Sequence, residues 1–101
     1  MNKNNQKNID IELTEDVAYG IYSNIAVINH SQSEFVVDFI QMMPNVPKAK
    51  VKSRIILTPQ HAKRFAKVLN GNIKNFEAEH GEILDSEVKI PINFLVPQGE
   101  A

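Results

Sequence analysis

Histidine is the side chain most often used for metal binding and for proton transfer near neutral pH, so the three histidines are the first candidates for chemistry. His30, His61 and His80 are scattered along the chain, and none has a second histidine three or four residues away, the spacing of a helical metal pair. Cysteine is absent, which excludes thiolate ligands and a cysteine nucleophile. The sequence therefore predicts no metal site and no cofactor.

Serine is the other candidate nucleophile. Ser23, Ser31, Ser33 and Ser53 lack the flanking glycines of a nucleophile elbow, and no glycine-rich loop precedes a helix to hold a phosphate group. We therefore expect a non-enzymatic protein with no catalytic residues.

Basic side chains form two groups. In an extended chain, every second residue lies on the same side. In a helix, residues three or four positions apart lie on the same face. One interpretation is that both groups are solvated faces, and the alternative is a nucleic-acid-binding surface. Nucleic acid is the less favoured partner, because the periodicity places most aromatic residues in the core rather than among the charges. The predicted basic patch consists of Lys50, Lys52, Arg54, Lys63, Arg64 and Lys67.

One long amphipathic helix is predicted within residues 51–81, directly after a strand. Thr58 is a good N-cap, Pro59 suits the first helical position, and Gly81 supplies the stop. Its apolar side should pack on a sheet, and Leu69→Ala should then lower the free energy of unfolding by about 2–5 kcal/mol. The apolar positions at helical spacing are Ala62, Phe65, Ala66, Leu69, Ile73 and Phe76.

Alternating apolar residues predict strands before the helix, at residues 9–14, 19–29, 34–43 and around 51–57. A possible bulge lies at residues 23–24. Centring the second hairpin on Val46 sets Phe35 opposite Leu57 and Asp38 opposite Arg54. Centring the first hairpin on Ser31 sets residue 27 opposite residue 35 and keeps one face apolar across three strands.

The fold class is therefore α+β: an antiparallel β-meander of about four strands, packed on one long C-terminal amphipathic helix. The face of the sheet away from the helix carries more apolar side chains than a monomer usually exposes, which predicts a homo-oligomer. The predicted interface residues on this outer face are Tyr22, Ile28, Val36, Ile40 and Ile56.

Residues 1–8 are rich in Asn and Lys and are expected to be disordered, residues 9–83 to form one domain, and residues 84–101 an extended arm. Pro91 restricts this arm to an edge strand or to a surface. The formal net charge of −1 gives no general attraction to nucleic acid. The start of the chain is unlike a signal peptide, and no apolar run could span a membrane, so a cytoplasmic protein is expected.

Two stretches, SEFVVDF (33–39) and SRIILTPQHAKRF (53–65), carry a resemblance. The chain resembles a family of short bacterial proteins known only as a domain of unknown function, which implies a fold and a bacterial origin but no activity. The order of meander, LTP-type cap and long helix is also similar to the export chaperone SecB. That likeness implies binding of polypeptide segments by a self-associating protein-interaction module.

Overall fold

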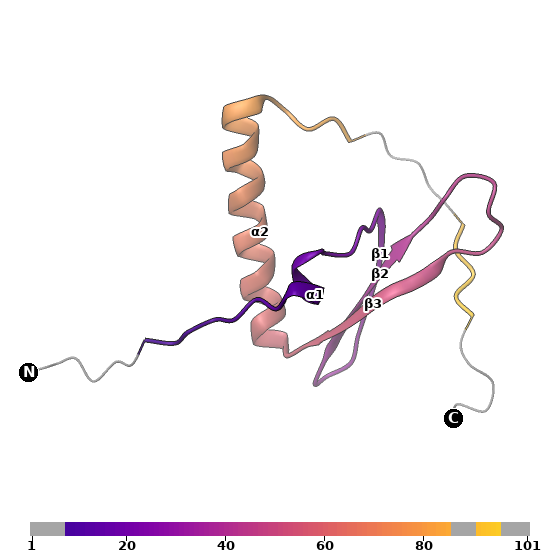
Figure 1. Ribbon diagram of the computed structural model, residues 1–101, viewed down its shortest axis with the longest axis horizontal. Helices are drawn as coiled ribbons and strands as arrows, with labels where there is room; N and C mark the ends of the chain where they lie inside the picture. The colour runs from indigo at the N-terminus through magenta and orange to yellow at the C-terminus, as the bar shows by residue number, and fades with distance from the viewer. Residues whose placement is uncertain (1–7, 86–90, 96–101) are drawn as a thin grey trace, which may run out of the picture. The chain divides into compact units, whose positions relative to one another are not determined.

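The computed structural model describes residues 8–85 and 91–95 (Figure 1). The chain divides into two units, Met1–Ala66 and Lys67–Ala101, and the boundary falls within the long helix. The elements are α1 (Glu15–Ala18), β1 (Ile25–His30), β2 (Phe35–Gln41), β3 (Lys50–Leu57) and α2 (Pro59–His80).

The α+β class is confirmed: three antiparallel strands in the order β1-β2-β3 are followed by one long helix. The prediction of about four strands is wrong for the described residues. Residues 9–13 alternate as predicted but form no strand, and β1 begins only at Ile25 rather than near residue 19. Alternation alone does not make a strand, because the backbone groups also need a neighbouring strand to pair with.

The second hairpin has the predicted register. Phe35 lies opposite Leu57 and Asp38 opposite Arg54. In the connecting loop, the Val46 N–H donates to the Met43 carbonyl over 3.3 Å, and Asn45 has φ 65°. Pro44 precedes Asn45, so the loop has the residue types of a type II turn, which needs positive φ at its third position. A bulge between Phe39 and Ile40 then shifts the pairing, so that Ile40 lies opposite Val51.

The predicted register of the first hairpin is wrong. His30 lies opposite Phe35 and Ile28 opposite Val37. The connecting loop is therefore four residues long, and its Ser31 N–H donates to the Glu34 carbonyl over 2.9 Å. The register differs from the predicted one by an odd number of residues, so every side chain of β1 lies on the opposite face from the one expected.

Each face of the sheet follows from this pairing, because directly opposed residues share a face. We call the two sides the Val37 face and the Asp38 face. The Val37 face contains Ala26, Ile28 and His30 from β1, Phe35, Val37 and Phe39 from β2, and Ser53, Ile55 and Leu57 from β3. The Asp38 face contains Ile25, Val27 and Asn29 from β1, Val36, Asp38 and Ile40 from β2, and Val51, Arg54 and Ile56 from β3.

The start of β1 is fixed by side chains rather than by the bulge predicted at residues 23–24. The Asn24 amide donates to the Met42 carbonyl over 2.9 Å and accepts from the Met42 N–H over 2.8 Å. The Ser23 hydroxyl lies 3.0 Å from the carbonyl oxygens of Ile25 and Ile40. These contacts satisfy main-chain groups at the point where regular pairing of β1 with β2 ends.

The predicted ends of α2 are confirmed. The Thr58 hydroxyl accepts from the His61 N–H over 3.1 Å, as an N-cap does, and Pro59 is the first helical residue. Gly81, with φ 95°, follows the last residue and donates its N–H to the Glu77 carbonyl. No described residue of α2 is buried, so the predicted packing of its apolar side on the sheet is not confirmed.

Thr58→Ala should lower the free energy of unfolding by about 1 kcal/mol, because the His61 N–H loses its acceptor. Urea denaturation followed by helical circular dichroism measures this change. Thr58→Ser keeps the hydroxyl and is the matched control, for which we expect less than about half of that loss. Equal stability of the alanine and serine variants would contradict the cap.

The predicted C-terminal arm lies partly outside the described residues, since the structure describes residues 84–85 and 91–95 of it. Residues 91–95 form no strand. Of the segment predicted to be disordered, only residue 8 is described. The proposal that the arm docks at a sheet edge therefore stays a prediction.

Candidate interaction surface

Both faces of the sheet carry exposed apolar side chains at their outer strands. On the Val37 face, Ile28 is 60% exposed, and on the Asp38 face Ile56 is 56% exposed. The central strand is better covered, and its Val37 and Ile40 are the two buried hydrophobic residues among those described. A three-stranded sheet with two apolar faces needs a covering layer on each of them.

A single ion pair interrupts the Asp38 face. The Asp38 carboxylate accepts from Arg54 Nε over 2.7 Å and from Nη2 over 3.0 Å, a bidentate geometry. The Asp38 side chain is 1% exposed, whereas that of Arg54 is 55% exposed. The hydrogen bonds and the negative charge of Asp38 raise the pKa of Arg54 above its ordinary value, so the guanidinium stays charged whenever the protein is folded.

A shallow groove of about 460 Å³ adjoins the Val37 face. One wall comes from Phe39, Ser53 and Ile55 of the sheet, and the other from the segment that contains α1. The first turn of α1 holds Asp16, whose pKa is lowered by hydrogen bonds from the Thr14 hydroxyl and from main-chain N–H groups. The groove-lining residues of the α1 segment are Asp16, Val17, Gly20, Ile21 and Ser23.

The predicted interface residues do not share one face. Val36 and Ile56 lie opposite each other on the Asp38 face, whereas Ile28 lies on the Val37 face. Ile40 is on the Asp38 face but buried, so the single chain does not present it to a partner. Tyr22 is exposed and precedes β1, outside the paired strands. The predicted register of the first hairpin is shifted by an odd number of residues, and this shift explains why Ile28 was expected on the wrong face.

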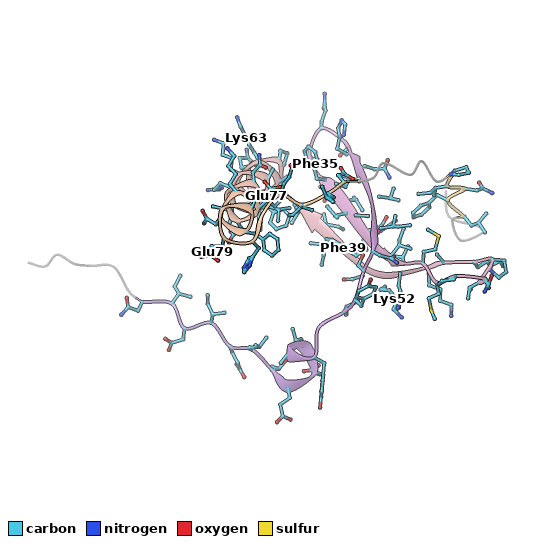
Figure 2. All side chains as sticks on the ribbon, turned by 90° about the horizontal axis from the view of Figure 1, so that it is seen from above. Phe35, Phe39, Lys52, Lys63, Glu77 and Glu79 are labelled. Carbon is cyan, nitrogen blue, oxygen red and sulfur yellow. The ribbon has the colours of Figure 1, made fainter. Side chains whose placement is uncertain are left out.

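The predicted basic residues are all exposed, and they come from two elements. Figure 2 labels one from each, Lys52 and Lys63. Lys50, Lys52 and Arg54 belong to β3, and the other three belong to α2. Phe35 and Phe39 lie on the Val37 face, opposite to the face of Arg54. A nucleic-acid surface would combine cations with stacking aromatic rings on one side, so this arrangement gives that alternative no support. The members on α2 are Lys63, Arg64 and Lys67.

Two of the three histidine rings contact a phenylalanine ring, and the third histidine takes part in the helix cap through its main chain. The His30 ring stacks on Phe35 with 5.2 Å between ring centroids, and the His80 ring lies 4.8 Å from that of Phe76. The His61 main chain takes part in the helix cap. Within residues 8–85 and 91–95, no group of three or more possible metal-ligating side chains is found.

Sequence reasoning missed α1, and it assigned the side chains of β1 to the wrong faces of the sheet. The sequence does carry a signal for α1, because Thr14 precedes two acidic residues in the first turn and Gly20 follows the helix. In the structure, Gly20 has φ 78° and donates its N–H to the Val17 carbonyl. Such a short helix gives no periodicity. Both faces were expected to be apolar, but the wrong register exchanged the two sets of β1 side chains between them.

The comparisons with known proteins are informative about the family alone. No described helix is long and apolar enough to cross a membrane. No curated protein and no solved structure matches the chain. A family model described as "Protein of unknown function (DUF3467)" matches residues 1–85.

Proposed function

Because the chain belongs to the DUF3467 family, whose description assigns no activity, we propose a function from its surfaces: a non-enzymatic, cytoplasmic protein-interaction module that self-associates through its sheet. The proposal is carried by one observation. The sheet is apolar on both faces, yet only Val37 and Ile40 are buried among the described hydrophobic residues.

Exposed apolar side chains are found both on the sheet and on α2. A soluble monomer rarely leaves large contiguous apolar patches in water, and closed homo-oligomers are the usual way in which they are covered. Burial of these side chains in an oligomer would be favourable by roughly 25 cal/mol for each Å² removed from water. Examples on the sheet are Ile28, Val51, Ile55 and Ile56, and examples on α2 are Phe65, Val68, Leu69, Ile73 and Phe76.

Ile56→Lys and Ile28→Lys test which face associates, because the two residues lie on opposite faces. We expect a wild-type oligomer by light scattering at high micromolar concentration. Each substitution places a charge in any interface that uses its face. The substitution on the associating face should therefore raise the dissociation constant of the oligomer at least tenfold. Gln32→Lys is the control, since Gln32 is exposed in the loop between β1 and β2 and lies on neither face.

A monomeric wild-type protein at high micromolar concentration would overturn the proposal. An oligomer that both lysine variants leave intact would also overturn association through the faces. Loss of secondary structure in a variant, read by circular dichroism, separates misfolding from dissociation.

Binding of extended polypeptide segments is a second candidate function. Among the described strands, β1 and β3 each have a neighbour on one side only. Unpaired main-chain groups at such an edge can accept another strand. Fluorescence anisotropy of a labelled, unfolded apolar peptide should then rise on addition of the protein, and an unchanged anisotropy at saturating protein would contradict this role.

A further inference from the structure

We propose that residues 9–13 of one copy pair as an added strand with the outer edge of β3 in a second copy. The proposal deepens the self-association proposed above but uses the edge of the sheet instead of its faces. It rests on three observations: an exposed alternating segment, an edge strand, and complementary charge between them.

The segment has the pattern of a strand without a partner. Ile9 is 85% exposed and Ile11 is 90% exposed, and Asp10 and Glu12 alternate with them. Figure 1 shows this stretch running away from the three strands of its own unit. An extended segment with one apolar and one acidic side is stabilised when its apolar side is covered and its main-chain groups are paired.

The outer edge of β3 can pair with the main chain of the segment and can cover its apolar side. This eight-residue strand pairs with β2 on one side, and no described strand lies on its other side. Its sequence also alternates, with Lys52 and Arg54 separated by Ser53. The two hydrogen bonds to Asp38 use only part of the guanidinium, which has further N–H donors, and the Arg54 side chain as a whole is 55% exposed.

Charge complementarity identifies the occupant. In an antiparallel register with Asp10 opposite Arg54, Glu12 lies opposite Lys52 and Ile11 opposite Ser53. Both carboxylates then meet both cations, and the apolar residues of the segment extend the Val37 face next to Ile55. Opposite charges on directly opposed residues stabilise a strand pair, whereas like charges destabilise it. Pairing of β3 with a second β3 would instead bring the cations of both strands together.

Cysteine cross-linking tests the pairing, because the natural chain has no cysteine. Opposed residues of antiparallel strands have Cα atoms about 4.5–5.5 Å apart, within the range that a disulfide spans. Chains with Ile11→Cys and chains with Ser53→Cys are unfolded in urea, refolded together and oxidised. We expect the disulfide-linked heterodimer on a non-reducing gel at a yield at least tenfold above that of Ile11→Cys with Ser33→Cys, a loop position.

A heterodimer yield equal to that of the loop control would overturn the proposal. The same holds if the double variant Ile11→Cys/Ser53→Cys cross-links only within one chain, because the segment would then pair in its own copy. This result is independent of the face variants: cross-linking without dissociation by Ile28→Lys or Ile56→Lys would contradict the face proposal alone.

Charge reversal tests the register. Glu12→Lys should lower the yield of the Ile11→Cys and Ser53→Cys heterodimer at least twofold at low salt, and Lys52→Glu in the partner chain should restore it. Glu15→Lys, in α1 outside the segment, is the matched control and should leave the yield unchanged. Undiminished cross-linking with Glu12→Lys would overturn the charge-based recognition.

Discussion

Replacement of Arg54 by leucine should strongly destabilise the folded sheet. Asp38 is fully buried and accepts both of its side-chain hydrogen bonds from this one residue. The substitution leaves that carboxylate without a partner, and a buried carboxylate that has lost its partner lowers the free energy of unfolding by about 3 kcal/mol. Urea denaturation at pH 7, followed by circular dichroism, measures the effect.

Replacement of both partners separates the buried charge from the loss of packing. Asp38→Val/Arg54→Leu should regain most of the stability, to within about 1 kcal/mol of the natural protein, because apolar residues of suitable volume can substitute for a buried pair. Lys52→Leu, at an exposed cation of the same strand, should change the stability by less than about 0.5 kcal/mol. A double variant as unstable as Arg54→Leu alone would show that the pair is needed for more than charge neutralisation.

Truncation of Ile40 should have the second large effect. Ile40 is one of the two buried hydrophobic residues among those described, so Ile40→Ala should lower the free energy of unfolding by about 2–4 kcal/mol. Leu69→Ala is the informative comparison, because the sequence predicts a loss of about 2–5 kcal/mol for it. In the structure Leu69 is 48% exposed, and we expect a loss below about 1 kcal/mol at low micromolar concentration.

The two variants should be compared at several protein concentrations. If the loss of unfolding free energy caused by Leu69→Ala grows with protein concentration, Leu69 lies in an interface between copies. A loss above 2 kcal/mol for a protein shown to be monomeric would contradict the exposure of Leu69 in the single chain.

The two hairpins show how far the sequence determines the register. In the second hairpin, the opposite charges of Asp38 and Arg54 and the apolar pair of Phe35 and Leu57 all agree on one alignment, and the structure has it. In the first hairpin, β1 is apolar on both sides, since residues 25–28 are Ile, Ala, Val and Ile. Period-two patterning then cannot choose a face, and the length of the loop decides.

The candidate surface was only partly predictable for the same reason. The opposition of Asp38 and Arg54 follows from the alignment, but the alignment does not predict that the Asp38 side chain is 1% exposed. The apolar character of the chain predicts that it associates. Which residues face a partner depends on the register and on burial: the wrong register misplaced Ile28, whereas Ile40 lies on the expected face but is buried.

The meander has a consequence for how the protein forms. Each strand pairs with the strand next to it in the chain, through connections of four and eight residues. Closing such short loops costs little conformational entropy, and folds dominated by sequence-local contacts reach their native pairing quickly. The sheet can therefore form before two chains meet. Refolding would proceed in a fast phase independent of protein concentration, followed by a slower second-order phase in which the exposed segments and faces find their partners.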